Sequence, residues 1–364
     1  MRIAQIAPLA ESVPPKLYGG TERVVHWLTE ELQGLGHEVT LFASGDSKTS
    51  AELVPVIPHA LRLGRPRIDP IVAQASLLEA AARQCHRFDV LHFHIDWLHL
   101  PLFSRLETRF LTTFHGRLDL PGLKTTTDQF PDAGFVSISN NQREPLPDLR
   151  WLRTVYHGLP ANYLRASTEP GRYLAFLGRL TAEKGPEDAI RIAKAVGMQL
   201  RIAAKIPRGE RRYFSERLQP LIDGDQVQLV GEVDDHAKQD FLSQASALLF
   251  PIDWPEPFGL VMIEAMACGT PVIAYRSGSV PEVIDHGITG FVVDDEAEAV
   301  KAIHQLDQLD RKRVREQFKA RFTAERMARE YTEVYKTLLN GAAEKLSFAP
   351  GLRPNSSVSP AGLP

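Results

Sequence analysis

The stretch ALLFPIDWPEPFGLVMIEAMACGTPVIAY, residues 247–275, contains a complete strand–helix–strand unit. The short apolar runs Ala247–Phe250 and Pro271–Tyr275 predict two buried strands. Between them, Phe258–Cys268 is apolar over a helical length and predicts a buried helix. Parallel strands need a crossover connection of this kind, so the stretch favours a parallel sheet covered by helices.

The same alternation of strands and helices runs through the rest of the chain. In the first half the expected strands are Arg2–Ala7, Val39–Ala43, Val90–Ile95, Phe110–Phe114, Phe135–Ile138 and Thr154–Tyr156, with helices after Gly19-Gly20 and at Ile71–Arg87. The pattern breaks at Leu159–Gly171 and then restarts. The further strands expected are Tyr173–Leu177, Leu200–Ala204 and Val227–Val230, with helices at Glu187–Val196, Arg211–Ile222 and His236–Ala245. Two such series predict an α/β fold of two doubly wound, parallel-sheet domains that face a central cleft.

Composition and charge argue against several classes of protein. The chain has 364 residues and a net charge of -3, so binding to nucleic acid through basic charge is not expected. Its two cysteines, Cys85 and Cys268, lie in no zinc-type cluster, and the cytoplasm is the expected location. No apolar run is long enough to span a membrane, and the N-terminal run is too short for a signal peptide. Peripheral contact with a membrane stays open.

The last part of the chain divides into a helix and a tail. Glu325–Leu339 has an apolar stripe at helical spacing, which favours a helix that covers a hydrophobic edge over one that binds a partner. Residues 341–364 are rich in proline, serine, glycine and alanine, and we expect them to be disordered.

Two glutamates, Glu256 and Glu264, bracket the start of the helix in the opening stretch, with seven residues between them. Glu264 stands among apolar residues, where a charge is rarely placed unless it holds something. The start of a helix just after Pro257 is also an anion site, because its first N–H groups are unpaired. Carboxylates for sugar or ribose hydroxyls beside a phosphate cradle suggest a nucleotide-sugar site.

Two glycine-containing turns follow predicted strands. In Gly178–Gly185, Arg179 and Lys184 could hold a diphosphate, although most such basic pairs are simply solvated turns. The Gly19-Gly20 turn would allow close approach to an anion or a sugar, and the alternative is an ordinary tight turn. The spacings of a P-loop and of a GxGxxG dinucleotide motif are both absent.

Several histidines cluster near predicted strand ends. His92, His94 and Asp96 alternate, so they would share one strand face and could bind a metal. Buried polar groups at strand ends more often bond the backbone or line a cleft, which we favour here. His115 ends its strand before Gly116 and would face the cleft, where it could bond a substrate hydroxyl.

Together, Glu256-Pro257-Phe258-Gly259 with Glu264, the Arg179 and Lys184 turn, and Gly269–Ala274 resemble the retaining glycosyltransferases of family 4. The resemblance covers the chain from Met1 to about Leu339 and implies the GT-B fold. It implies an acceptor domain at residues 1–165 and a donor domain at 166–322. A crossover helix at 323–340 would then return to the first domain.

The resemblance also implies roles for individual residues. Arg179 and Lys184 would hold the donor diphosphate, Glu264 the ribose, and Glu256 the transferred sugar. The backbone around Phe258, Gly259 and Leu260 would support sugar and phosphate, the Gly19-Gly20 turn would approach the phosphate, and His115 would meet the primary hydroxyl. Of these, Glu256, His115, Arg179 and Lys184 are the expected catalytic residues. Arg117 and Asp119 would lie near the acceptor.

The implied reaction moves a hexose from a nucleotide diphosphate sugar, with UDP-glucose as the default donor, to a saccharide, lipid or small-molecule acceptor. The configuration would be retained by a same-face route without a metal or other cofactor. The family often has Asn-Gly where this chain has His157-Gly158. The alternatives are an epimerase or phosphorylase on the same fold, a non-catalytic nucleotide-sugar-binding protein, and a metal hydrolase built on His92, His94 and Asp96.

Overall fold

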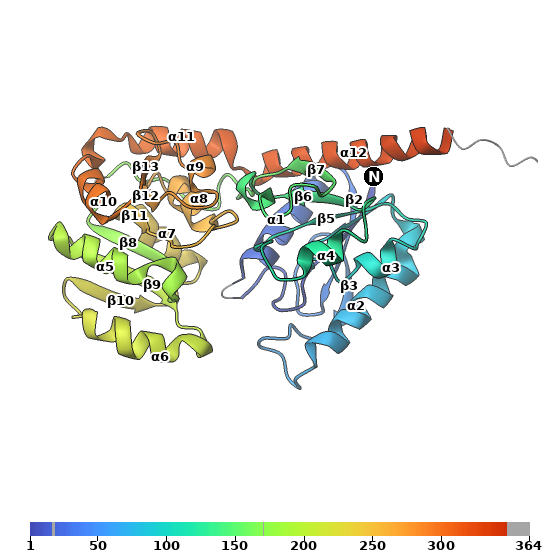
Figure 1. Cartoon of the computed structure of the whole chain (residues 1–364), viewed down its shortest axis with the longest axis horizontal. Coiled ribbons are helices and arrows are strands. Elements are labelled where there is room, and N and C mark those ends of the chain that lie inside the picture. The colour runs from blue at the N-terminus through green and yellow to red at the C-terminus, as the bar shows by residue number, and fades with distance from the viewer. Residues whose placement is uncertain (17–18, 170, 348–364) are drawn as a thin grey trace, which may run out of the picture.

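Two parallel β-sheets form the centres of two lobes (Figure 1). The structure is a computed structural model that describes residues 1–16, 19–169 and 171–347. The first sheet has seven strands in the order β3-β2-β1-β4-β5-β6-β7, and the second has six in the order β10-β9-β8-β11-β12-β13. The predicted α/β fold with two doubly wound domains is therefore confirmed.

The first lobe is built from residues 2–154. Its strands are β1 (Arg2–Ile6), β2 (Glu38–Ser44), β3 (Glu52–Ile57), β4 (Val90–Phe93), β5 (Phe110–Thr113), β6 (Gly134–Ser137) and β7 (Trp151–Thr154), and its helices are α1 (Gly20–Gly34), α2 (Pro70–Gln84), α3 (Leu100–Phe103) and α4 (Leu123–Thr127). Asp69 caps α2 by accepting from the backbone N–H groups of Ile71 and Val72. Helix α1, which the sequence predicted after Gly19-Gly20, buries Val24, Val25 and Leu28.

The second lobe follows the same plan. Its strands are β8 (Tyr173–Arg179), β9 (Leu200–Lys205), β10 (Val227–Gly231), β11 (Ala245–Phe250), β12 (Val272–Tyr275) and β13 (Gly290–Val293), and its helices are α5 (Pro186–Ala195), α6 (Arg211–Tyr213), α7 (Asp235–Ser243), α8 (Leu260–Ala267), α9 (Val280–Val283), α10 (Glu296–Ile303) and α11 (Arg311–Arg321). Chain order reverses between β1 and β4 in the first sheet and between β8 and β11 in the second. Ligands of doubly wound sheets bind at such switch points.

Helix α12 (Ala324–Ser347) crosses back and runs along the first lobe (Figure 1). The two connections between the lobes lie side by side, because the N–H of Leu159 donates to Phe322 O and that of Ala324 donates to Leu159 O. A Cβ at Gly158 would lie 2.2 Å from the carbonyl oxygen of Thr323, so only glycine fits this approach. Tyr331 and Tyr335 of α12 are buried against the first lobe.

A carboxylate of the second lobe bonds the first lobe near the same junction. Glu282 of α9 accepts from the backbone N–H groups of Asn140 and Asn141, at 2.8 and 2.7 Å, and from the hydroxyl of Tyr156 at 2.9 Å. We call this contact the Glu282 clamp.

Several predicted elements need correction. Strand β3 was not expected, because Pro55 interrupts its sequence, but β3 is an edge strand, where proline is tolerated. The strand predicted at Thr154–Tyr156 lies at Trp151–Thr154. The helix predicted at Arg211–Ile222 is instead a short α-turn followed by π and 3-10 segments, and Pro220 lies in the last of these.

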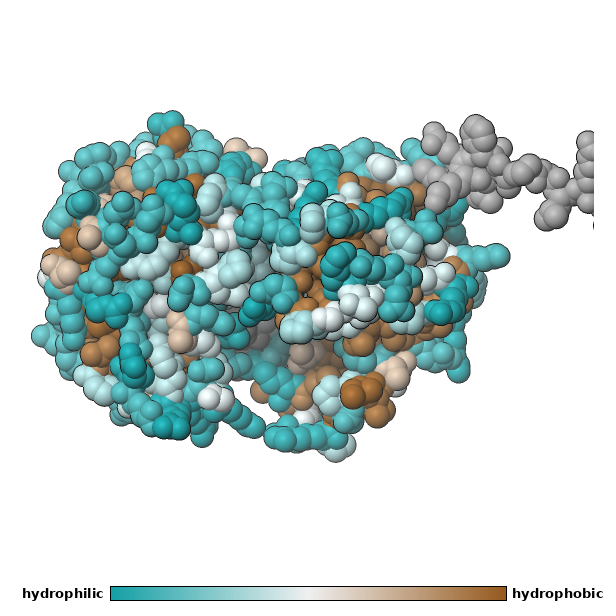
Figure 2. Space-filling model, viewed as in Figure 1, coloured by the Kyte–Doolittle hydropathy of each residue, from teal (hydrophilic) through white to brown (hydrophobic). Residues whose placement is uncertain are grey.

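Other differences lie at element ends and on the surface. The sequence did not predict strand β13 or helices α10 and α11. Helix α12 continues past residue 340, so the segment predicted as a disordered tail begins as helix. The rest of that segment, residues 348–364, lies outside the described residues. No helix among the described residues is long and apolar enough to cross a membrane. On the face seen in Figure 2 the surface is mainly hydrophilic, and hydrophobic residues gather on the first lobe.

Candidate active site

A cavity of about 540 Å³ lies between the lobes, where the carboxyl ends of both sheets meet. It is lined by residues of both lobes, and Figure 2 shows the hollow between them. All donor-binding and catalytic residues expected from the sequence line it: Gly19, Gly20, His115, Arg179, Lys184, Glu256, Phe258, Gly259, Leu260 and Glu264. The structure therefore brings these residues together, although their roles stay predictions.

Two helix N-termini face each other in the cavity. Helix α1 begins after Gly19 and helix α8 after Gly259, and neither glycine can cap the N–H groups with a side chain. Gly259 has φ 78°, which an L side chain rarely adopts. A Cβ at Gly20 would lie 3.4 Å from the side chain of Leu260, so the two helix starts are in close approach. Both helix dipoles present their positive ends to the cavity, which suits an anion.

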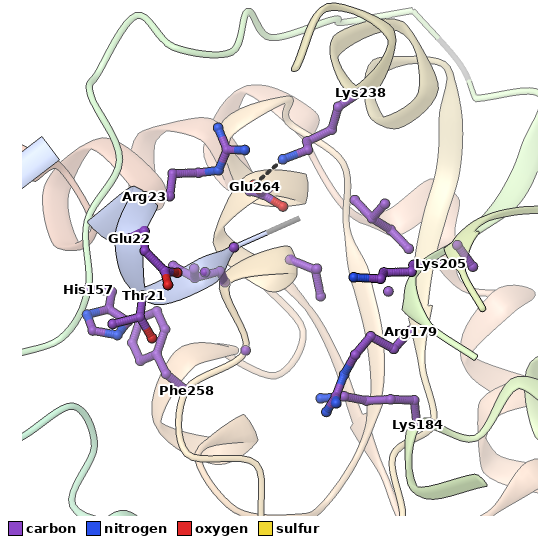
Figure 3. A pocket seen from close by; sticks show the side chains of 18 of the residues that line it. Thr21, Glu22, Arg23, His157, Arg179, Lys184, Lys205, Lys238, Phe258 and Glu264 are labelled. Atoms are coloured by element: carbon purple, nitrogen blue, oxygen red, sulfur yellow. Dashed lines mark hydrogen bonds and ion pairs between the residues drawn. The ribbon is translucent and has the colours of Figure 1, made fainter. Parts of the chain in front are cut away.

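A basic wall, formed by Arg179, Lys184 and Lys205, lies on one side of the cavity (Figure 3). Arg179 and Lys205 are register partners at the ends of β8 and β9. Burial and then the positive charges of Arg62 and Arg179 lower the pKa of Lys205. A guanidinium and two ammonium groups at one sheet edge offer several donors to phosphate oxygens, so the wall suits a diphosphate.

Glu256 is held at this wall by an ion pair with Lys184. The Lys184 ammonium also lies 4.7 Å from the centre of the Trp254 ring. The loop that carries Glu256 is braced from behind, since Ser279 donates its backbone N–H to Glu256 O at 2.9 Å and its hydroxyl to Phe258 O at 2.9 Å. The carboxylate is therefore positioned before any ligand arrives.

Glu264 is buried on α8 and pairs with Lys238 of α7 at 2.7 Å (Figure 3). Lys238 also lies 3.7 Å from Asp235, and Asp235 pairs with Arg23 of the first lobe at 2.6 Å. This polar cluster, which joins α1, α7 and α8, crosses the cleft. Burial raises the pKa of Glu22, which lies in the first turn of α1 and also lines the cavity.

His115 lies between other imidazoles at the first-lobe side of the cavity. Its Nε2 is 2.8 Å from Nδ1 of His94, and its ring stacks on His157 with centroids 5.2 Å apart. His157 in turn meets the edge of Phe258 at 4.9 Å. Burial lowers the pKa of His115 to about 3, so the ring is neutral near pH 7.

The alternative metal site at His92, His94 and Asp96 does not form. Both ring nitrogens of His92 are hydrogen-bonded, to Tyr335 and Thr113, and both of His94 are bonded as well. β4 ends at Phe93, and Asp96 turns out of its line with φ 59° and is exposed. Within the described ranges, no group of histidine, cysteine or acidic residues is arranged to hold a metal ion.

Arg117 and Asp119 lie outside the cavity lining. They pair with each other through two hydrogen bonds of 2.6 Å at an exposed position. Their expected place near an acceptor stays a prediction.

Sequence reasoning missed several polar residues that line the cavity, among them Glu22, Arg23, His157, Lys205 and Lys238. Lys205 had a signal, because it directly follows the predicted strand Leu200–Ala204, and β9 lies next to the strand that ends at Arg179. Lys238 and Arg23 had none, since each sits on a helix face whose neighbours are set only by the packing of α7 on α8 and of the two lobes.

Family models match both lobes of the chain. Residues 18–160 match the model described as Glycosyltransferase Family 4, and residues 165–321 match that described as Glycosyl transferases group 1. The N-acetyl-alpha-D-glucosaminyl L-malate synthase of Bacillus anthracis is 38% identical over 123 residues, which span 32% of each chain. The glycogen synthase of Mycobacterium tuberculosis is 26% identical over 332 residues, 76% of this chain and 79% of that one.

A solved structure extends the likeness to the whole fold. The Anabaena protein Alr3699/HepE, in complex with UDP and glucose, has a TM-score of 0.67 and 17% identity, and the match covers 95% of this chain and 99% of that one.

Proposed function

The chain belongs to the group 1 glycosyltransferases with a family 4 first lobe, and we propose that it transfers a sugar from a nucleotide diphosphate sugar to an acceptor hydroxyl. The observation that carries this proposal is one cavity that joins the basic wall, two helix N-termini and the carboxylates Glu256 and Glu264. A diphosphate, a ribose and a sugar each find complementary groups there.

The donor would bind along the second lobe. Its diphosphate would lie against Arg179, Lys184 and the start of α8, and its ribose hydroxyls would donate to Glu264. Glu256 would accept from hydroxyls of the transferred sugar, which reaches toward His115 of the first lobe. UDP-glucose is the donor we propose, because the Anabaena structure of the same fold is in complex with UDP and glucose. The acceptor would be a saccharide, lipid or small molecule.

The proposed chemistry follows from where positive charge lies. As the bond between the anomeric carbon and the diphosphate oxygen breaks, negative charge grows on the diphosphate, where Arg179, Lys184 and the α8 N–H groups can stabilise it. The acceptor oxygen would form its bond on the same face, and its proton would pass to the leaving diphosphate oxygen. This route retains the configuration and uses these positive groups in place of a metal ion.

The two cysteines are both free, and Cys268 is buried with a pKa that burial raises to about 12. Thiols of this kind suit a reducing compartment, so we place the enzyme in the cytoplasm.

Binding of the donor is the first test. Calorimetry with UDP-glucose, GDP-mannose and ADP-glucose in the presence of EDTA should identify one donor that binds tightly. Lys184→Met should lower the affinity for that donor about 100-fold, because it removes a charge-assisted hydrogen bond. Lys301→Met, on the exposed side of α10, is the matched control and should bind like the wild type. Equal affinity of the wild type and Lys184→Met for the donor would show that Lys184 does not bind the diphosphate.

Turnover separates transfer from the alternatives. Release of nucleotide diphosphate together with loss of the sugar from the donor indicates transfer, to water or to an added acceptor. Recovery of an isomerised nucleotide sugar would instead indicate an epimerase, and a product phosphorylated at the anomeric carbon a phosphorylase. Tight binding without any turnover across an acceptor panel would favour a binding protein. Glu256→Gln should lower the turnover far more than the stability.

A further inference from the structure

A chain of buried hydrogen bonds connects α12 to the cavity. Gln5 donates its Nε2–H to the hydroxyl of Tyr335 at 3.1 Å, and its Oε1 lies 2.7 Å from Nε2 of His94. Nδ1 of His94 lies 2.8 Å from Nε2 of His115, which lines the cavity. We call these four residues the histidine chain. Its members come from β1, the segment after β4, the segment after β5, and α12.

Gln5 determines which atom donates in each hydrogen bond of the histidine chain. Because the amide nitrogen of Gln5 donates to Tyr335, its Oε1 can only accept, so Nε2 of His94 carries the proton. His94 is neutral, so its Nδ1 is bare and accepts from Nε2–H of His115. A neutral His115 with its proton on Nε2 then has a bare Nδ1, and this atom is buried and has no partner among the described residues.

Burial supports the neutral state of both rings. It lowers the pKa of His94 well below its usual value, with the neighbouring imidazoles adding to the effect, and it lowers the pKa of His115 to about 3. Neither ring carries a second proton near pH 7, so each has one donor and one acceptor.

The hydrogen bonds of the α12 tyrosines agree with this direction of donation. The Tyr335 hydroxyl accepts from Gln5, so its own proton goes to Nδ1 of His92 at 2.8 Å. His92 then donates from Nε2 to Thr113 at 2.7 Å, and Thr113 lies 2.9 Å from the hydroxyl of Tyr331. Each bond in this branch has one proton, so the same direction satisfies every member.

We propose that His94 is a positioning residue that fixes His115 with its proton on Nε2, so that Nδ1 of His115 accepts a hydrogen bond from a hydroxyl of the bound sugar. The role of His115 toward a sugar rests on the proposed function, whereas the tautomer does not. Since the histidine chain begins at Tyr335 of α12, this helix is part of the active-site architecture.

The tautomer is tested without any substrate. In the full-length protein labelled with ring-¹⁵N histidine, the signals of His115, assigned by His115→Gln, should show a protonated Nε2 and a bare Nδ1. A proton on Nδ1 of His115 in the wild type overturns the proposal, whether or not any variant folds.

Kinetics test the consequence, with UDP-glucose hydrolysis as the probe. His94→Leu removes the acceptor and should lower kcat about tenfold with KM within about threefold, because the donor contacts of the second lobe are untouched. His94→Asn has an oxygen close to the place of Nδ1, and it should restore kcat. His99→Leu is the matched control, as His99 is equally buried in the same lobe but bonds Thr112 and not the chain.

The outcomes separate the two proposals. If His94→Leu is as active as His99→Leu, or if Asn restores nothing, the positioning role is wrong. If His115 shows the expected tautomer while no nucleotide sugar binds the wild type, the proposed function fails and the tautomer assignment stands.

Discussion

Replacing Lys238 by methionine removes the partner of a buried carboxylate. The side chains of Lys238 and Glu264 are 11% and 5% exposed and lie 2.7 Å apart. Lys238 is the one ion-pair partner of Glu264 within the part of the chain that the structure describes, whereas Lys238 has a second carboxylate, Asp235, at 3.7 Å. The two ends of the pair are therefore not equivalent.

The expected magnitude follows from this asymmetry. With an effective dielectric constant of about 20, two unit charges at this distance attract by about 6 kcal/mol. Removing one partner of a buried pair leaves the other unpaired and costs about 3–5 kcal/mol. We expect Lys238→Met to lower the free energy of unfolding by that amount. Glu264→Gln should cost less, about 1–2 kcal/mol, because Lys238 retains Asp235 and the amide can still hydrogen-bond.

Urea unfolding followed by circular dichroism measures these differences, with Lys301→Met as the control for loss of an exposed lysine. The double variant Lys238→Met/Glu264→Gln should be more stable than Lys238→Met alone, since it buries no unpaired charge. A Lys238→Met protein within about 1 kcal/mol of the wild type, or one more stable than the double variant, would refute the reasoning.

Three further predictions concern the junction and the histidines. Glu282→Ala removes the clamp between the lobes, so small-angle scattering of the unliganded protein should show a larger radius of gyration; an unchanged curve contradicts this. Gly158→Ala places a Cβ 2.2 Å from Thr323 O, so urea unfolding should show a free energy of unfolding about 1–3 kcal/mol lower than that of the wild type. A decrease below about 0.5 kcal/mol would show that the two connections between the lobes separate easily. Buried histidines with lowered pKa take up protons only on unfolding, so stability should be full above pH ~6.5 and fall as the pH drops toward about 3. His99→Phe should make that fall shallower by about 1.4 kcal/mol per pH unit, and an unchanged slope would show that His99 is not the neutral group described.

Much of the fold could be predicted because each buried strand of a parallel sheet leaves a continuous apolar run. The same rule placed Arg179 and His115 at strand ends, and the structure brings both to one cavity. Glu264 was recognisable because a charge inside an apolar helix needs a partner. Its actual partner in the unliganded site, Lys238, could not be found from the sequence, since only tertiary packing brings α7 against α8.

The errors have equally local causes. Edge strand β3 was not predicted because Pro55 interrupts its sequence. Strand β7 was placed too far along the chain because Val155 and Tyr156 extend its apolar run. His92 lies on β4 and His94 follows the strand, with their rings side by side, but the nitrogens of His92 are already bonded to Tyr335 and Thr113. No local pattern reports a partner more than two hundred residues away.

The return of α12 to the first lobe sets the order in which the protein can be completed during synthesis. Gln5 and His92 leave the ribosome early, yet their buried partner Tyr335 is translated only after the whole second lobe. Until α12 is made, the groove that it fills on the first lobe stays open. The second lobe, although it is synthesised later, can therefore complete its core before the first lobe does. A released chain truncated before residue 324 should thus have a native second lobe beside an incomplete, protease-sensitive first one.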